Sequence, residues 1–198
     1  GAIEFFKEGK KQEVKPIIGL EGYITRDMNT KVKDNFHVTL LAKNYEGYKN
    51  LMKLTSIAHM KGFYYKPRFS KEILKEHSNG LICFSGCPAA EIPQYLIDGN
   101  YEEAKKLTEW YTDVFKDDFY IEIQRHGYEK ILPNITDTAL RSTLSNVATE
   151  CKAVEEGVIK LSRDLGIPLV VTNDAHYIKK GDAEAQDALL CIATGKTV

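Results

Sequence analysis

The chain has 198 residues, of which 43% are hydrophobic and 28% are charged, and its formal net charge is -1. This composition is typical of a folded globular protein and excludes both a disordered chain and a strongly basic nucleic-acid-binding protein. The apolar runs are too short to cross a membrane, so we expect no membrane partner. Four cysteines without a secretory signal favour reduced thiols in a cytoplasmic protein.

Helices and strands alternate in the first part of the chain. We expect a helix over residues 2–12, an apolar strand over 14–24 and a second strand over 36–42. Asn44 is placed to cap a helix over residues 45–60. The residues of this helix expected to face the core are Tyr48, Leu51, Met52 and Ile57.

The alternation continues to the end of the chain, which predicts a single α/β domain over residues 1–198. Ser70 and Asn100 are placed to cap two of the expected helices. The expected helices cover residues 71–77, 89–96, 101–115 and 183–193, with a mainly helical stretch over 132–166. The expected strands cover residues 80–85, 119–124 and 168–177, and the last of them is predicted to be buried.

Asp174 and His176 lie one residue apart at the end of the last predicted strand. In extended backbone such a pair projects both side chains to the same side, and carboxylate and imidazole are good metal ligands. In parallel sheets and barrels the site lies at the ends of the strands. An ordinary polar turn explains the same two residues equally well.

Three more ligand types lie near predicted strand edges. Glu21 interrupts an apolar strand, His37 lies near the start of its strand, and Cys87 follows the strand over 80–85. Carboxylate, imidazole and thiolate together suit zinc or manganese-like ions, and a metal cluster suits hydrolysis of a phosphate ester. The alternative is a set of unrelated polar residues in an α/β domain, and spacing alone does not decide between the two.

Two short segments are candidates for contact with nucleic acid or phosphate. Residues 61–68 interleave cations with aromatic rings, and Lys66 and Arg68 are the cations that we expect to reach a phosphate. A solvated loop with packed aromatic rings explains this pattern as well. Arg125 and His126 follow the strand over 119–124 and form the second candidate contact.

Five strings carry a resemblance to a known family: residues 15–21, 36–43, 62–68, 80–87 and 171–177. Together and in this order they resemble the PHP (polymerase and histidinol phosphatase) domain of bacterial DNA polymerase III alpha subunits. The resemblance covers nearly the whole chain. It implies an α/β fold, namely part of a distorted (β/α)7 PHP barrel that lacks its first strands.

The resemblance also implies a metal cluster that holds zinc or manganese at the mouth of the barrel. Its ligands in this chain would be Glu21, His37, Cys87, Asp174 and His176. Glu21 would be the bridging carboxylate, and Glu21 and Asp174 would be catalytic. The family's opening His-x-His motif and its Asp-His pair would lie upstream of Gly1, so we expect an incomplete site and weak or no activity from the fragment alone. Residues 131–153 are longer than the family pattern and are expected to be a surface insertion.

The expected function is that of a part of the replicative DNA polymerase, with metal-dependent 3′–5′ exonuclease chemistry in the intact protein. The implied partners are DNA, the remaining domains of the alpha subunit, whose polymerase domain would use magnesium, and a separate proofreading exonuclease subunit. Two alternatives stay open. One is a non-catalytic module that supports the polymerase and docks partners, and the other is a stand-alone PHP phosphoesterase.

Overall fold

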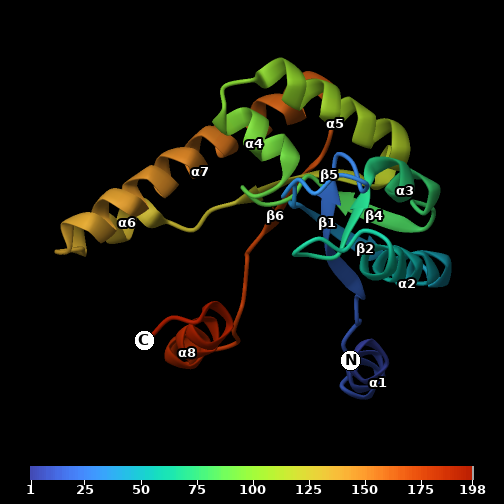
Figure 1. Cartoon of the computed structure of the whole chain (residues 1–198), viewed down its shortest axis with the longest axis horizontal. Coiled ribbons are helices and arrows are strands. Elements are labelled where there is room, and N and C mark those ends of the chain that lie inside the picture. Colours follow the sequence, from blue (N-terminus) through green and yellow to red (C-terminus); the bar gives the residue numbers. More distant parts are fainter. Residues whose placement is uncertain (198) are drawn as a thin grey trace.

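A computed structural model describes residues 1–197, which form one six-stranded sheet and eight α-helices (Figure 1). The strands are β1 (Gly19–Thr25), β2 (Phe36–Ala42), β3 (Arg68–Ser70), β4 (Leu81–Phe84), β5 (Phe119–Gln124) and β6 (Leu169–Thr172). The helices are α1 (Ala2–Lys11), α2 (Tyr45–Met60), α3 (Lys71–Glu76), α4 (Glu91–Ile97), α5 (Tyr101–Phe115), α6 (Tyr128–Ile131), α7 (Thr138–Leu165) and α8 (Ala183–Thr194). Short 3-10 helices cover Lys116–Asp118, Leu132–Asn134 and Lys180–Asp182. The predicted α/β class is therefore confirmed.

The sheet is mixed and open, with the strand order β3-β1-β2-β4-β5-β6. Strand β2 runs antiparallel to both of its neighbours, β1 and β4, whereas β1 and β3, β4 and β5, and β5 and β6 pair in parallel. Because of this reversal, the start of β2 lies at the same edge of the sheet as the ends of the other strands. That edge is where the predicted ligands are found.

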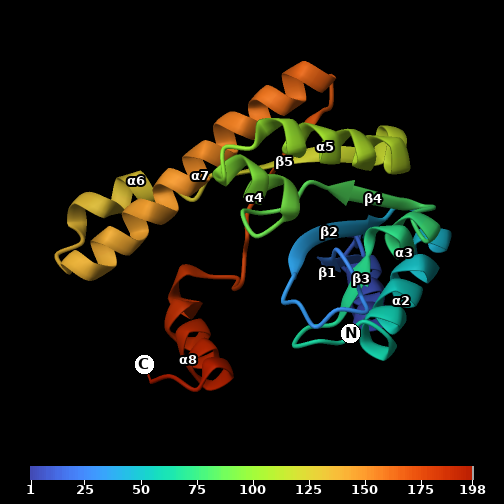
Figure 2. The ribbon, with the colours of Figure 1, turned by 45° about the horizontal axis from the view of Figure 1, so that its top comes forward.

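The two faces of the sheet differ in character. Residues that pair directly across strands share a face, and successive residues alternate between faces. One face carries buried apolar residues, including Val38, Leu40 and Ile121, and packs against helices (Figure 2). The opposite face is called the site face here, and the register assigns it Glu21, Tyr23, His37, Thr39, Phe84, Tyr120 and Glu122.

Side-chain caps explain where the main helices begin. The Oδ1 atom of Asn44 accepts a hydrogen bond from the amide of Gly47 at 3.0 Å, and Ser70 and Asn100 cap α3 and α5 in the same way. Each cap satisfies an amide that has no partner within the helix. All three predicted caps are confirmed.

Two expectations for the first half of the chain were wrong. The first strand begins at Gly19 and not at residue 14, since Pro16 has no amide hydrogen to give to a strand ladder. In α2, Met52 is 45% exposed, and the buried stripe runs through Leu51, Leu54 and Ala58. These three residues are spaced by three and four positions and so lie on one side of the helix, whereas Met52 is only two positions from Leu54 and lies on another side.

Two strands also differ from expectation. The short strand β3 was not predicted, and it pairs in parallel with the end of β1. The last strand has four residues and is not buried: Leu169 is 42% exposed and Val171 is 77% exposed. Strand β6 lies at the edge of the sheet and pairs only with β5 among the described residues, so one of its faces stays uncovered.

Three helical regions lie partly or wholly away from the core. The first half of α7 is mainly exposed and projects with α6 beyond the sheet (Figure 1), whereas Val154, Val158 and Leu161 bury the second half. Residues 131–153 therefore lie on the surface, and their origin as an insertion stays a prediction. Helices α1 and α8 lie apart from the sheet in Figure 1, and neither has a buried residue. Within residues 1–197, none of the helices has the length and apolar content to span a bilayer.

Candidate metal centre

Three of the five predicted ligands meet at one imidazole nitrogen on the site face. The Nδ1 atom of His37 lies 2.9 Å from the Oε1 atom of Glu21 and 3.4 Å from the Sγ atom of Cys87. Glu21 comes from β1, His37 from the start of β2, and Cys87 from the loop after β4. The antiparallel direction of β2 explains why a histidine at the start of its strand joins residues near the ends of others.

The loop after β4 holds Cys87 against β2. Gly86 has a φ of +88°, and a Cβ atom there would lie 2.5 Å from the Cβ of Ala90, so the turn requires glycine. The amide of Ala90 donates to the carbonyl of Cys87 at 2.8 Å, and the amide of His37 donates to the carbonyl of Ala89 at 3.2 Å. These backbone bonds hold the loop that carries Cys87 against the start of β2, which carries His37.

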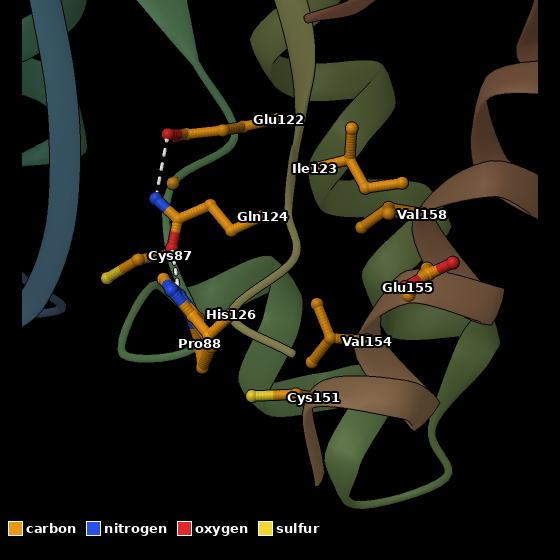
Figure 3. Close-up of a pocket in the computed structure, with 11 residues that line it drawn as sticks. Cys87, Pro88, Glu122, Ile123, Gln124, His126, Cys151, Val154, Glu155 and Val158 are labelled. Atoms are coloured by element: carbon orange, nitrogen blue, oxygen red, sulfur yellow. Dashed lines mark hydrogen bonds between the residues drawn. The ribbon is translucent and has the colours of Figure 1, made fainter. Parts of the chain in front are cut away.

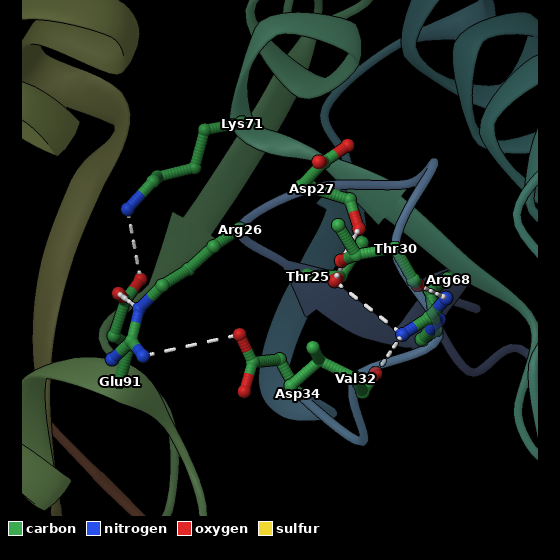
Figure 4. Close-up of polar contacts among 9 residues, drawn as sticks. All are labelled: Thr25, Arg26, Asp27, Thr30, Val32, Asp34, Arg68, Lys71 and Glu91. Carbon is green, nitrogen blue, oxygen red and sulfur yellow. Dashed lines mark hydrogen bonds and ion pairs between the residues drawn. The ribbon is translucent and has the colours of Figure 1, made fainter.

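Two buried charged residues anchor the loop between β1 and β2, which leads directly into His37 (Figure 4). Glu91 is 4% exposed and pairs with Arg26 at 3.2 Å and with Lys71 at 3.0 Å. Arg68 is 1% exposed, and its guanidinium donates to the carbonyls of Gly62 at 3.2 Å and Val32 at 2.5 Å. Both residues therefore position the site without being part of it.

Lys66 and Arg68, the two cations of residues 61–68 that were expected to contact phosphate, differ in their exposure to solvent. Arg68 is buried and its donors face backbone carbonyls, so its place in the fold does not favour a phosphate contact. Lys66 is exposed, and its Nζ atom lies 5.5 Å from the centre of the Tyr23 ring. The Tyr23 ring in turn packs edge-on against His37 at 5.2 Å. The Tyr23 ring thus lies between the exposed ammonium group of Lys66 and the imidazole of His37.

Asp174 and His176 form a pair of their own after β6. The Nδ1 atom of His176 lies 2.8 Å from the carbonyl oxygen of Asp174 and 3.8 Å from its carboxylate, and both side chains are more than half exposed. The negative charge of Asp174 contributes to raising the pKa of the Cys87 thiol. Within residues 1–197, no hydrogen bond or ion pair joins His176 to Glu21, His37 or Cys87.

The environment of Cys87 keeps its thiol protonated. Burial is the main reason that the pKa of Cys87 is raised, and a hydrogen bond with the backbone of Ala89 opposes this effect. The negative charges of Asp174, Glu122 and Glu21 raise the pKa further. Because a metal binds the thiolate, metal binding at this residue would release a proton.

Arg125 and His126, the second candidate phosphate contact, are both exposed. Arg125 forms an ion pair with Glu155 of α7, so its charge is already partly balanced. The Nε2 atom of His126 lies 3.3 Å from the Oε1 atom of Gln124, and both residues line the same small pocket as Cys87 (Figure 3).

The donor chemistry around His37 fits zinc or manganese. Ligand atoms bound at about 2.0–2.3 Å in a tetrahedron are roughly 3.3–3.8 Å from one another. The 3.4 Å separation of Cys87 and His37 falls in this range, and the 2.9 Å separation of Glu21 and His37 is that of a direct hydrogen bond. Within residues 1–197, however, no three His, Cys, Asp or Glu side chains form a group that would hold a metal ion by themselves. A metal ion bound here would therefore need further ligands.

The sequence reasoning missed Glu122 on β5. This carboxylate is 5% exposed and lines the pocket beside Cys87 (Figure 3). The signal was present, because Glu122 interrupts an apolar strand as Glu21 does. The alternation of apolar and polar residues in this strand is, however, equally typical of a strand with one exposed face.

Comparison with known proteins identifies the family. Residues 1–126 match the PHP domain. The chain belongs to the PHP domain family. Its open six-stranded sheet with flanking helices corresponds to part of a PHP barrel, as the five strings implied.

Similar proteins are named DNA polymerase III subunit alpha. The chain is 43% identical to the protein of Borreliella burgdorferi, in an alignment that covers 98% of this chain and 16% of the relative. It is 42% identical to the protein of Helicobacter pylori, over 100% of this chain and 16% of the relative. For Thermus aquaticus the identity is 40%, over 100% of this chain and 15% of the relative. This PHP chain therefore spans about one sixth of the length of its relatives.

Proposed function

We propose that this chain is the PHP domain of a replicative DNA polymerase III alpha subunit, and that in the intact protein it hydrolyses phosphodiester bonds at the 3′ end of DNA. The observation that carries the proposal is the meeting of Glu21 and Cys87 at the Nδ1 atom of His37. The relatives support the polymerase context, since they bear the name DNA polymerase III subunit alpha.

In this proposal Glu21, His37, Cys87, Asp174 and His176 hold zinc or manganese together with ligands from outside residues 1–198. A metal held by these residues would supply a hydroxide nucleophile and a positive charge for the leaving oxygen. Glu21 is suited to bridge, because its side chain is 59% exposed and one of its oxygens already faces His37. Asp174 adds a carboxylate on the side of Cys87.

Lys66 and Tyr23 would hold the end of the DNA strand. The ammonium group of Lys66 suits a phosphate, and the Tyr23 ring, packed edge-on against His37, offers a face to a base. The wider proposal includes DNA, the other alpha-subunit domains with a magnesium-dependent polymerase site, and a separate proofreading exonuclease subunit as partners.

The test uses the full-length alpha subunit and a DNA primer with a mismatched 3′ end, without nucleotides. We expect Asp174→Asn to lower the rate of 3′-end removal about 100-fold or more, because a metal ligand is weakened. Asp113→Asn is the matched control, since the side chain of Asp113 is 85% exposed on α5, and it should leave the rate unchanged. Full activity of Asp174→Asn after removal of metal by a chelator would overturn the catalytic proposal.

A second candidate is a non-catalytic module that stabilises the polymerase and docks a separate exonuclease. It is favoured by the finding that residues 1–197 contain no group of three ligands able to hold a metal alone. Under this alternative, Cys87→Ala and His176→Ala leave the metal content of the full-length subunit unchanged. Removal of the PHP domain then lowers the stability of the polymerase.

A further inference from the structure

Glu122 lies in the row of predicted ligands across the site face. The strands that contribute these residues are neighbours in the order β1, β2, β4, β5 and β6. Glu21 lies on β1, His37 on β2 and Cys87 after β4, whereas Asp174 follows β6. Strand β5 is the one strand in this order without a predicted ligand, and Glu122 occupies its site face.

The register places Glu122 at the level of His37. The row Glu21, Thr39, Phe84 and Tyr120 runs across four paired strands. His37 lies two residues from Thr39 toward the site edge, and Glu122 lies two residues from Tyr120 in the same direction. Figure 3 shows Glu122 and Gln124 projecting to the side of Cys87, whereas Ile123 points to Val158 of α7.

One half of the Glu122 carboxylate is held firmly. Its Oε1 atom accepts hydrogen bonds from the Nε2 atom of Gln124, at 3.1 Å, and from the hydroxyl of Thr172. The main-chain amide of Glu122 donates to the Oγ atom of Ser85 at 2.9 Å. Gln124 of β5 and Thr172 of β6 therefore orient the carboxylate, and Ser85, which follows β4, holds the main chain that carries it.

The other half has no partner. Oε2 of Glu122 and Oδ1 of Asn35 are the buried side-chain polar atoms without a hydrogen bond among the described residues. No lysine, arginine or histidine of residues 1–197 forms an ion pair with Glu122. A buried carboxylate oxygen is costly unless a donor or a cation faces it. Its surroundings instead include the Cys87 thiol, which lines the same pocket.

We propose that Glu122 is a further metal-binding residue, whose Oε2 atom binds the divalent cation of the centre on the side of Cys87. The inference rests on the metal centre of the proposed function but not on its exonuclease activity. It gives every strand from β1 to β6 along this row one donor. It also gives this oxygen a positive charge that no ion pair within residues 1–197 supplies.

The test measures the affinity of the metal-depleted, full-length alpha subunit for Mn²⁺ by isothermal titration. Glu122→Gln keeps the shape and an oxygen for Gln124 and Thr172 but removes the charge. We expect it to weaken Mn²⁺ binding about tenfold or more. The matched control is Glu155→Gln, which changes a carboxylate of the same pocket that already pairs with Arg125, and it should stay within about twofold of wild type.

Thermal unfolding of the same variants separates metal binding from a structural role. We expect Mn²⁺ to raise the melting temperature of the wild type more than that of Glu122→Gln, since at a given concentration a ligand that binds more tightly stabilises the folded state more. In a chelator, Glu122→Gln should be at least as stable as the wild type, because a buried unpaired charge has been removed. Loss of stability in the chelator with unchanged Mn²⁺ affinity would overturn the inference.

The two proposals fail in different ways. A wild-type subunit that binds Mn²⁺ through Glu122 but does not remove 3′ nucleotides contradicts the exonuclease proposal alone. Equal Mn²⁺ affinity of the wild type and Glu122→Gln, with intact 3′-end removal, contradicts the inference alone. A wild-type subunit that binds no Mn²⁺ contradicts both.

Discussion

His37 and Arg68 have different roles at and around the candidate centre. His37 contacts Glu21 and Cys87 through one nitrogen, so the contacts among these three donors run through it. Arg68 touches none of the donors, yet it links the loop before β2 to the loop before β3 through hydrogen bonds to Val32 and Gly62. His37 is thus placed among the candidate ligands, whereas Arg68 stabilises the loops around them.

The buried position of Arg68 predicts an effect on stability. Arg68→Lys should lower the free energy of unfolding by about 2 kcal/mol or more, because one ammonium group cannot satisfy the separate carbonyls that the guanidinium reaches. Urea unfolding of the chain measures this. The exposed neighbour Lys66 is the control, and Lys66→Ala should change stability by no more than about 0.5 kcal/mol. An Arg68→Lys variant as stable as the wild type would show that the guanidinium is not a structural clamp.

At the scale of elements, helix α2 is fixed to the turn before β4 by a close backbone contact. Gly47 lies in the first turn of α2, and a Cβ atom there would lie 1.9 Å from the carbonyl oxygen of Gly80. Gly80 itself has a φ of +73° and lies beside the Asn44 cap. The start of α2 and the start of β4 are therefore packed backbone to backbone.

This contact reverses the usual effect of alanine in a helix. Helix propensity alone predicts that Gly47→Ala stabilises by about 1 kcal/mol. We expect it instead to destabilise by about 1–3 kcal/mol, since the added methyl group meets backbone that cannot move aside. Circular dichroism during urea unfolding gives the sign. Lys53→Ala, at an exposed position of the same helix, should be neutral within about 0.5 kcal/mol, and a gain in stability for Gly47→Ala would contradict the packing described.

For the whole molecule, local signals predicted the elements and distant contacts set their arrangement. The limits of β2, α2 and β5 follow from caps and alternation, which lie within a few residues of each element. The direction of β2 depends on pairing with β1 and β4, and the burial of Arg68 depends on the carbonyls of loops far from it in sequence. The lack of a hydrogen-bond partner for Oε2 of Glu122 likewise becomes visible only when the positions of Ser85 and Thr172 are known.

The same candidate ligands show this division. Their types and their places at strand edges could be predicted from the sequence. The meeting of Glu21, His37 and Cys87 could not, because it requires the reversal of β2 that no local pattern specifies. The resemblance to the PHP domain supplied that arrangement indirectly.

The open edge of the sheet predicts how the chain behaves on its own. Strand β6 exposes Leu169 and Val171 next to unpaired backbone groups, and such edges pair with other chains. We expect the chain alone to self-associate as its concentration rises, measured by sedimentation velocity. Val171→Lys should shift it toward monomer, whereas Val32→Lys, at an exposed loop position, should not. Equal association of the two variants would place the contact elsewhere.

The two faces of the sheet separate the residues that stabilise the fold from the candidate ligands. The apolar face carries the packing, while Glu21 and His37 lie on the other face and remain partly open to solvent. Mutations that remove these donors leave the hydrophobic core untouched. The donors on the site face can therefore change over evolutionary time while the domain keeps the packing that folds it.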